Sequence, residues 1–260
     1  MSILDELAAY ARIRVEKAKE IKSSNEICQE AFKIDKGNNA FEKAVKSKEL
    51  SFICECKKAS PSKGIIADDF HYLDIALDYE RAGADAISVL TEPKWFLGRD
   101  EYLEKISKAV KLPLLRKDFT VDEYMLYEAK IMGASAVLLI VAILQPAEIK
   151  RYLAISEELG LSALVECHDE KEVDTALESG ARIVGVNNRN LKDFSVDITL
   201  GEKLRKQIPE SVAFVSESGI RNAEDVRRLR SIGADAVLIG ETLMKAENRV
   251  EMLNTLRGKS

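Results

Sequence analysis

Charged side chains at the ends of short apolar runs are the residues of this sequence best suited to chemistry. Five of them share that position: Glu55, Lys57, Lys117, Glu166 and Glu217. Carboxylates and ammonium groups that meet in a partly buried site shift each other's pKa values. Such shifts make a lysine a usable acid and a glutamate a usable base near neutral pH. The residue types therefore indicate proton-transfer chemistry, provided that the fold brings them together.

A repeat in the sequence indicates which elements position these side chains. A helix-like segment ends at glycine and a short apolar run follows, closely in 82–90, 132–140 and 232–240 and more loosely in 159–166 and 179–187. Glycine suits the left-handed conformation that ends many helices. Repeated helix–glycine–strand segments predict βα units and a parallel sheet.

The repeat extends to eight predicted strands. They lie near residues 52–57, 85–90, 113–117, 135–141, 162–167, 182–187, 212–217 and 235–240. Helical patterns follow, among them 122–132, 146–159, 169–179 and 222–232. Eight βα units in about 210 residues predict an α/β fold, a (β/α)8 TIM barrel. A doubly wound open sheet is the alternative, but the Gly-x-Gly-x-x-Gly turn typical of it is absent.

The chain is predicted to have two parts. Residues 1–47 form an N-terminal helical extension, in which 36–39 is a turn before a second short helix. Residues 48–260 form the barrel as a single catalytic domain. The barrel places catalytic groups at the C-terminal ends of its strands.

Alternation along a strand places Glu55 and Lys57 on one face and the intervening Cys56 on the other. For any one of the five charges, the alternative is a solvated strand end or half of a structural ion pair. Their common position at one end of the strands favours a shared site.

Composition excludes several classes of function. The chain has 260 residues, 46% apolar and 32% charged, with a net charge of −5, which gives no reason to expect nucleic acid. No signal peptide or membrane span is visible. Two histidines and the Cys54-Glu55-Cys56 spacing argue against a metal site. Three of the four cysteines, Cys54, Cys56 and Cys167, lie in strand-like apolar runs, which fits a reducing cytoplasm, so we expect a cytoplasmic protein without metal or membrane.

Loops at the strand ends suggest where a ligand binds. Gly219 and Gly240 follow the last two strands, the usual phosphate position of this fold, and at Glu241 only the backbone N–H could help. The loop 60–64 could close over a ligand or be an ordinary turn. Arg189 could bind an anion or cap a helix.

Two further residues near the strand ends have competing interpretations. Phe96, after Trp95, could form an aromatic wall or pack beneath a loop. His168 follows Glu166 closely, but we expect it to begin the next helix and to have no catalytic role.

Taken together, these motifs resemble the indole-3-glycerol phosphate synthase family of the tryptophan pathway. The resemblance runs from the first predicted strand to the last, through residues 55–64, 90–96, 115–119, 136–141, 164–168, 185–191, 216–220 and 238–241. Cys54 and Cys56 depart from it, since aliphatic residues are expected there. Residues 1–47 are similar to the family's N-terminal extension.

The resemblance implies closure of an indole ring without a cofactor. The substrate would be 1-(2-carboxyphenylamino)-1-deoxyribulose 5-phosphate, which would lose carbon dioxide and water. Lys117 would act as the acid at the ketone oxygen. Glu166 would donate the proton for dehydration, with Glu55 close by. Lys57 would hold the substrate carboxylate or act as a second acid, and both roles stay open.

The remaining roles also follow from the resemblance. Asn187, Glu217 and Ser218 would orient substrate hydroxyls and the charged groups. Phosphate would bind the backbone at Gly219 and Gly240, with help from Ser218. The other substrate-binding residues would be Ser60 of the loop, Arg189, Glu241, and the anthranilate-pocket residues Pro61, Phe96, Phe119, Leu138 and Leu191. Association with other enzymes of the pathway is left open.

Two other functions remain as alternatives. The chain could be a barrel aldolase that uses Lys117 or Lys57 as a Schiff base. It could also be a barrel that binds a phosphorylated ligand without catalysis.

Overall fold

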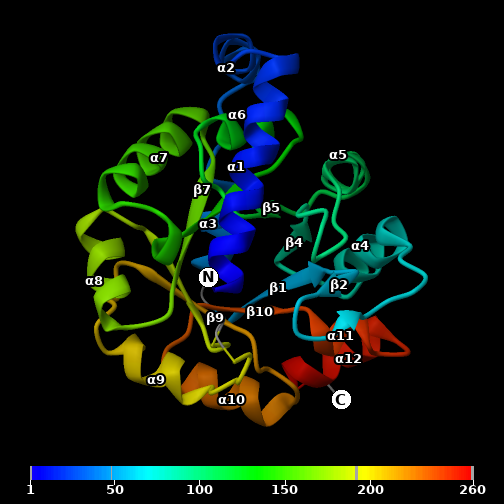
Figure 1. Ribbon diagram of the computed structural model, residues 1–260. Coiled ribbons are helices and arrows are strands. Elements are labelled where there is room, and N and C mark those ends of the chain that lie inside the picture. Colours follow the sequence, from blue (N-terminus) through cyan, green and yellow to red (C-terminus); the bar gives the residue numbers. More distant parts are fainter. Residues whose placement is uncertain (1, 48, 191–192, 259–260) are drawn as a thin grey trace.

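A closed parallel barrel forms the centre of the computed structural model, which describes residues 2–47, 49–190 and 193–258 (Figure 1). The barrel strands are β1 (Ser51–Cys56), β4 (Ala86–Leu90), β5 (Leu114–Lys117), β6 (Ala136–Ile140), β7 (Ser162–Cys167), β8 (Ile183–Asn187), β9 (Ala213–Glu217) and β10 (Ala236–Ile239). They pair in this order, and β10 closes onto β1. The closure confirms the predicted (β/α)8 barrel and excludes the open doubly wound sheet.

Helices surround the barrel and connect its strands (Figure 1). They are α4 (Tyr72–Arg81), α5 (Asp100–Ala109), α6 (Tyr124–Ile131), α7 (Pro146–Leu159), α8 (Glu170–Glu178), α9 (Thr199–Arg205), α10 (Ala223–Ser231), α11 (Glu241–Met244) and α12 (Arg249–Arg257), with a 3-10 turn, η1 (Val141–Ile143). The glycines of the sequence repeat have positive φ, at Gly83, Gly133, Gly160, Gly180 and Gly233. The repeat is therefore a helix-ending turn that leads into the next strand.

The N-terminal segment contains three helices, α1 (Ile3–Ile21), α2 (Ser24–Lys33) and α3 (Ala40–Val45). The prediction of two helices missed the break between α1 and α2. The cause is a capping box: the Ser23 hydroxyl accepts from the Glu26 N–H, and the Glu26 carboxylate accepts from the Ser23 N–H. These contacts satisfy backbone groups that a continuous helix would have paired.

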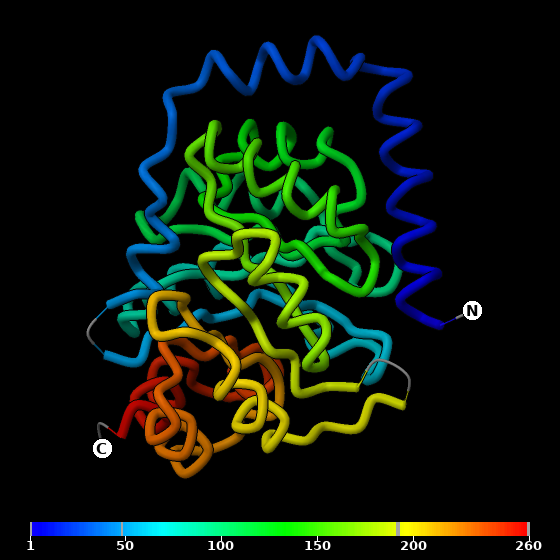
Figure 2. The backbone as a smooth tube through the Cα atoms, turned by 90° about the vertical axis from the view of Figure 1, so that its left-hand side faces the viewer, coloured from blue at the N-terminus to red at the C-terminus, as the bar shows by residue number. Residues whose placement is uncertain are grey.

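The N-terminal helices contact both ends of the barrel. Helix α1 passes in front of the barrel in Figure 1. In Figure 2, which is turned by 90°, the same helix runs along the right-hand edge of the molecule. Helix α2 packs against α6, and α3 packs against β1, β4 and β7. Phe41 and Val45 of α3 are fully buried, and the Glu42 N–H donates to the hydroxyl of Ser162, where β7 begins. Barrel and N-terminal helices therefore share one core.

Alternation along β1 places Glu55 on one face of the strand and the two buried cysteines, Cys54 and Cys56, on the other. Glu55 is within 3.4 Å of the Ser88 hydroxyl of β4, whereas Cys54 and Cys56 lie near α12, whose Arg249 and Arg257 are close. Burial raises the pKa of both thiols, so they stay neutral and act as small apolar side chains.

The loop after β1 is a short hairpin. Residues Ala59–Ser60 (β2) pair antiparallel with Gly64–Ile65 (β3). The Ala59 N–H donates to the Phe96 carbonyl, which ties the hairpin to the loop after β4. Within the described ranges, no helix is long and apolar enough to cross a membrane.

An ion pair joins α1 to the end of β5. The Arg14 guanidinium contacts both oxygens of Asp118, at 2.6 and 3.0 Å. The Asp118 side chain is fully buried and also accepts from the Thr91 hydroxyl and the Phe119 N–H. Burial opposes ionisation of Asp118, but Arg14 and Arg116 outweigh it and lower the pKa of this carboxyl. The pair fixes α1 beside the residue that follows Lys117.

Replacing Arg14 with Ala should destabilise the protein by about 3 kcal/mol, because it leaves a buried carboxylate without its cation. Urea unfolding measures this change. Arg12→Ala, on an exposed position of the same helix, is the matched control and should change stability by less than about 0.5 kcal/mol. Equal stability of the two variants would contradict a stabilising role for this pair.

Candidate active site

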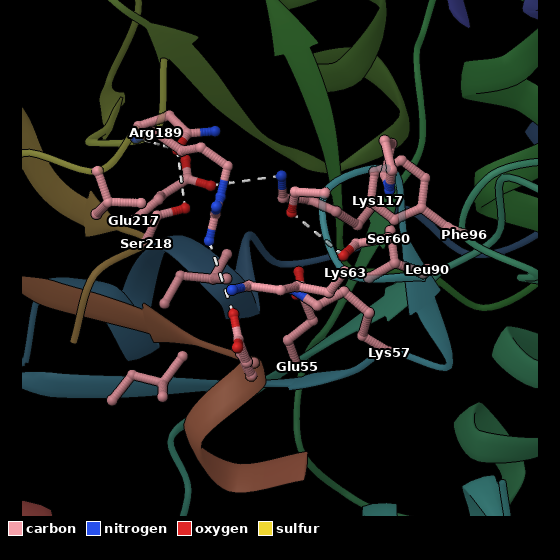
Figure 3. Close-up of a pocket in the computed structure, with 18 of the residues that line it drawn as sticks. Glu55, Lys57, Ser60, Lys63, Leu90, Phe96, Lys117, Arg189, Glu217 and Ser218 are labelled. Carbon is pink, nitrogen blue, oxygen red and sulfur yellow. Dashed lines mark hydrogen bonds and ion pairs between the residues drawn. The ribbon is translucent and has the colours of Figure 1, made fainter. Parts of the chain in front are cut away.

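A cavity of about 620 Å³ opens at the C-terminal ends of the barrel strands (Figure 3). Its size suits a drug-sized or metabolite-sized ligand. The predicted site residues that line it are Glu55, Lys57, Ser60, Pro61, Phe96, Lys117, Phe119, Leu138, Glu166, Asn187, Arg189, Glu217, Ser218, Gly219, Gly240 and Glu241. Leu191 lies outside the described residues.

Lys117 is the centre of the charged cluster. Its Nζ lies 3.2 Å from Glu166 Oε2 and 3.4 Å from Glu217 Oε2. Beside them, Lys57 Nζ lies 2.6 Å from Glu55 Oε1, and Figure 3 shows Glu55, Lys57, Lys117 and Glu217 pointing into one cavity, which Glu166 also lines. The three carboxylate side chains are at most 5% exposed. The structure thus brings together five charges from separate parts of the sequence.

The protonation states follow from burial and neighbouring charges. Burial disfavours the charged form of Lys117, but Glu166, Glu217 and Glu55 outweigh it and raise its pKa. Burial likewise opposes ionisation of Glu166, yet Lys117, His168 and Asn187 hold its pKa well below the usual range. In the resting site Lys117 is therefore an ammonium ion and Glu166 a carboxylate.

Glu217 differs from the other two carboxyl groups. Burial and the nearby carboxylates Glu166 and Glu55 raise the pKa of Glu217 to about 7, although Lys117 acts in the opposite sense. Its Oε1 is buried and has no hydrogen-bond partner among the described residues. Glu217 is the one carboxyl group of this cluster that can hold a proton near neutral pH in the resting site.

Two glycines leave room for these carboxylates. A Cβ at Gly185 of β8 would collide with Glu217 Oε1, and a Cβ at Gly240 would collide with Glu55 Oε1 and press on Lys57 Nζ. Gly240 was predicted only as a phosphate-binding turn, so its position beside Glu55 is an additional constraint. Gly185 was not predicted, although its place two residues before Asn187 on the inner face of a strand could have indicated it.

Asn187 connects the charged cluster to the loop after β9. Its amide nitrogen donates to Glu166 Oε1 at 3.3 Å, and its Oδ1 accepts from the Ser218 hydroxyl at 2.9 Å. The backbone N–H of Arg189 donates to the same Oδ1 at 3.1 Å. Ser218 and Gly219 both have positive φ, which turns the chain sharply here. Asn187 can therefore orient Glu166 and Ser218 together.

Cations surround the Gly219 and Gly240 side of the cavity. Arg189, Arg221, Lys245 and Lys63 all line it. Glu241 lies among them, with its carboxylate 2.6 Å from Lys245 Nζ and 3.8 Å from an Arg189 nitrogen. The side chain of Glu241 is thus paired with cations, so this end of the cavity can still accept an anion.

The opposite side of the cavity is apolar. The Phe96 and Phe119 rings lie 6.1 Å apart, and Pro61 and Leu138 also line this side. Ile3 and Leu7 of α1 complete the lining, which the sequence did not predict. Trp95 packs instead against Tyr10 of α1, with ring centroids 5.6 Å apart.

His168 is the residue whose position differs most from expectation. Asp169, not His168, caps α8 by accepting from the Glu172 N–H. The His168 ring reaches back to Glu166, with Nε2 3.2 Å from Oε1. Strand alternation could have indicated this, since residues 166 and 168 share a face of β7 if the strand continues.

The described residues contain no group of three or more His, Cys, Asp or Glu side chains arranged to hold a metal ion.

Comparison with known proteins gives full-length matches. A family model described as indole-3-glycerol phosphate synthase matches residues 4–256. The indole-3-glycerol phosphate synthase of Ruminiclostridium cellulolyticum is 58% identical over 259 residues, covering 99% of this chain and 100% of that protein. That of Endomicrobium trichonymphae is 50% identical over 256 residues, covering 98% and 99%.

Solved structures of more distant sequence share the fold. A 3-hexulose-6-phosphate synthase has a TM-score of 0.63 at 16% identity, covering 81% of this chain and 99% of that one. The N-acetylmannosamine-6-phosphate 2-epimerase of Clostridium perfringens has a TM-score of 0.61 at 17% identity, covering 78% and 90%. These likenesses support the barrel fold alone.

Gly185→Ala should lower kcat by about 10-fold or more, because the added methyl group displaces the Glu217 carboxylate from Lys117. Steady-state kinetics measures the loss. In a Glu217→Ala background the same glycine substitution should cost little further activity, since the colliding carboxylate is gone. An equal loss in both backgrounds would show that Gly185 acts independently of Glu217.

Glu217→Gln should change the pH dependence of stability. Because the folded-state pKa of Glu217 is raised to about 7, the native protein binds more protons than the unfolded chain between about pH 4.5 and 7, and its stability falls as pH rises through that window. The variant lacks this loss, so its free energy of unfolding relative to that of wild type should rise by on the order of 2 kcal/mol from pH 5 to pH 8. Urea unfolding at both pH values measures it, with exposed Glu210→Gln as the control. A pH-independent difference for Glu217→Gln would refute the assignment.

Proposed function

The chain belongs to the indole-3-glycerol phosphate synthase family, and we propose that Lys117 and Glu166 are the residues that move protons in this ring closure. The enzyme is a carbon–carbon lyase of tryptophan biosynthesis. Its substrate is 1-(2-carboxyphenylamino)-1-deoxyribulose 5-phosphate, which is closed to indole-3-glycerol phosphate with loss of carbon dioxide and water. The observation that carries the residue assignment is the contact of Lys117 with two buried carboxylates.

Lys117 protonates the ketone oxygen as the aromatic carbon attacks the ketone. Attack places negative charge on that oxygen, and an ammonium ion nearby stabilises it. Three carboxylates raise the pKa of Lys117 against the effect of burial, so its proton is present when the substrate binds. Once the alkoxide forms, its basicity exceeds that of the amine and the proton can move.

Glu166 delivers the proton that expels the hydroxyl group as water. Its carboxylate lies between Lys117 and the Asn187 amide, which hold it toward the centre of the cavity. Because Lys117 and His168 depress its pKa, Glu166 starts as a base and must gain a proton within the catalytic cycle. Glu217 orients Lys117 from the other side, at 3.4 Å.

Lys57 holds the substrate carboxylate, and Glu55 positions Lys57. Burial opposes ionisation of Glu55, but Lys57, Lys117 and the Ser88 hydroxyl outweigh it and lower its pKa. The 2.6 Å contact of Glu55 with Lys57 keeps the ammonium group near the cavity wall. From there it can offer its remaining protons to an anion.

The two ends of the cavity suit the two ends of the substrate. Phosphate binds the backbone of Gly219 and Gly240 with the Ser218 hydroxyl, and Arg189 supports it. The backbone of Glu241 contributes, and Asn187 orients the hydroxyl groups. The anthranilate ring lies among the apolar residues Pro61, Phe96, Phe119 and Leu138, and the Ser60 hairpin borders it.

The protonated state of Lys117 argues against the alternative in which this lysine forms a Schiff base. A Schiff base forms through a neutral amine, and such lysines have a depressed pKa. The carboxylates around Lys117 raise its pKa instead. A barrel that only binds phosphate is also disfavoured, because binding alone does not require three buried carboxylates around two lysines.

The wider setting of the enzyme is proposed on the same basis. Residues 1–47 act as an extension of a catalytic barrel formed by residues 48–260. The partner is a phosphorylated small molecule, with no nucleic acid or membrane surface involved, and the reaction takes place in the cytoplasm. No cofactor takes part.

Purified protein should convert this substrate to product with indole fluorescence. Lys117→Met and Glu166→Gln should each lower kcat by roughly 10²-fold or more, as expected for losses of general acid–base groups. Exposed Lys108→Met is the matched control and should keep wild-type kcat. Near-normal rates in Lys117→Met or Glu166→Gln would refute the assigned role, and no turnover by the wild-type protein would refute the proposed reaction.

A further inference from the structure

The reaction consumes one proton from solvent in every turnover. One proton converts the ketone oxygen to hydroxyl, and a second converts that hydroxyl to water. One proton is released when the carbon next to nitrogen loses hydrogen to form the indole double bond. The carboxylate leaves as neutral carbon dioxide, and its bonding electron pair returns to the ring. The balance is one proton taken up, so the site needs a route by which it enters.

Lys117 and Glu217 can hold protons inside the cavity, but a net uptake of one proton per turnover means that the cavity must be recharged from solvent. Lys117 gives its proton to the ketone oxygen and, as a neutral amine, can recover the proton released from carbon. Glu166 is ionised in the resting site, because Lys117 and His168 lower its pKa against the effect of burial. Only 3% of its side chain is exposed, and it lines the cavity where the proposed substrate would bind. Glu166 therefore needs a donor outside the cavity.

His168 lies between the buried carboxylate of Glu166 and a second carboxylate nearer the surface. Its Nε2 makes an ion-pair contact with Glu166 Oε1 at 3.2 Å but no aligned hydrogen bond, whereas its Nδ1 is hydrogen-bonded to Glu172 Oε2 at 3.1 Å. The His168 backbone N–H also donates to Glu172 Oε2, at 2.7 Å. The side chains of His168 and Glu172 are each 18% exposed, so both meet solvent. His168 does not line the cavity, so it faces Glu166 from behind.

The surroundings keep His168 charged. Burial disfavours the imidazolium, but Glu166 and Glu172 outweigh it and raise the pKa of His168 to about 10. These two carboxylates are the charged groups within ion-pair distance of the ring among the described residues. The turn η1 packs against both β7 and α8 and consists of Val141, Ala142 and Ile143, which cannot titrate.

We propose that His168 passes protons from solvent to Glu166 during turnover. The imidazolium gives its Nε2 proton to Glu166 Oε1 and keeps the proton on Nδ1, and Glu166 gives its proton to the leaving hydroxyl. The bare Nε2 then recovers a proton from solvent through rotation of the partly exposed ring. His168 acts through Glu166 and does not touch substrate, so it is a positioning and relay residue. This inference rests on the proposed function.

Ring closure itself can trigger the transfer. While Lys117 is charged, it stabilises the Glu166 carboxylate 3.2 Å away, and the proton stays on His168. When Lys117 has given its proton to the ketone oxygen, that stabilisation is lost and the pKa of Glu166 rises toward that of its neighbour. The proton then becomes available to Glu166 at the stage that needs it, after the hydroxyl has formed.

The test is chemical rescue in a variant that lacks the ring. His168→Ala should lower kcat by about 10-fold or more with little change in KM, since substrate contacts are intact. Added imidazole should restore kcat in proportion to the imidazolium concentration at constant ionic strength. It should not rescue Glu166→Gln, because the relay ends there. The matched control is His71→Ala, which replaces the exposed histidine before α4.

Three results would overturn the relay. One is a kcat for His168→Ala equal to that of His71→Ala. Another is a lowered kcat that added imidazole does not restore, in a His168→Ala protein whose urea unfolding matches that of wild type. If that variant unfolds early, His168→Gln fills the space of the ring without its charge, and a wild-type kcat in His168→Gln would be the third. Turnover by the wild-type protein tests the proposed function separately from these outcomes.

Discussion

The structure of the site depends on one buried ammonium group, Lys117, surrounded by carboxylates. Without it, Glu166 and Glu217 would be two buried negative charges without a cation between them, and burial would favour their protonation. With it, Glu166 stays ionised, whereas burial and the neighbouring carboxylates hold the pKa of Glu217 at about 7 against the opposing effect of Lys117. One cation between two acids thus produces two different protonation states, which is what acid–base chemistry at neutral pH requires.

The scaffold around Lys117 is built to permit this arrangement. Gly185 leaves space for the Glu217 carboxylate, and Gly240 leaves space for Glu55, so small residues on neighbouring strands determine where the acids lie. On the far side, Arg14 of α1 pairs with Asp118, the residue directly after Lys117. The N-terminal helix therefore covers the cavity with Ile3 and Leu7 and is fixed beside the strand that carries the central cation.

Most of the barrel could be predicted from the sequence, because each strand is a local apolar run and five of the eight (β4, β6, β7, β8 and β10) follow a glycine turn. Strand ends also indicated which charges converge. The sequence could not indicate which oxygen pairs with which nitrogen, since such contacts join residues as far apart as Arg14 and Asp118. Asp169 caps α8 and His168 directly precedes it, as expected, but the helix-start pattern gave no indication of the contact between the His168 ring and Glu166. Whether the His168 ring reaches Glu166 depends on how the end of β7 packs in three dimensions, which local sequence patterns do not determine.

Charge balance explains how the resting site accepts an anionic substrate at both ends. Arg189 and Lys245 face Glu241 at the phosphate end, and Lys57 faces Glu55 at the other, so each cation already has an anionic neighbour. Substrate phosphate and carboxylate then add negative charge to paired groups. The 3.8 Å separation of Arg189 from Glu241 is longer than a hydrogen bond, so the nitrogen facing Glu241 is free of a close anionic partner while another nitrogen donates to the Phe194 carbonyl. The 2.6 Å contact of Lys57 with Glu55 is close, so in the proposed binding mode Lys57 would donate to Glu55 and to the substrate carboxylate together.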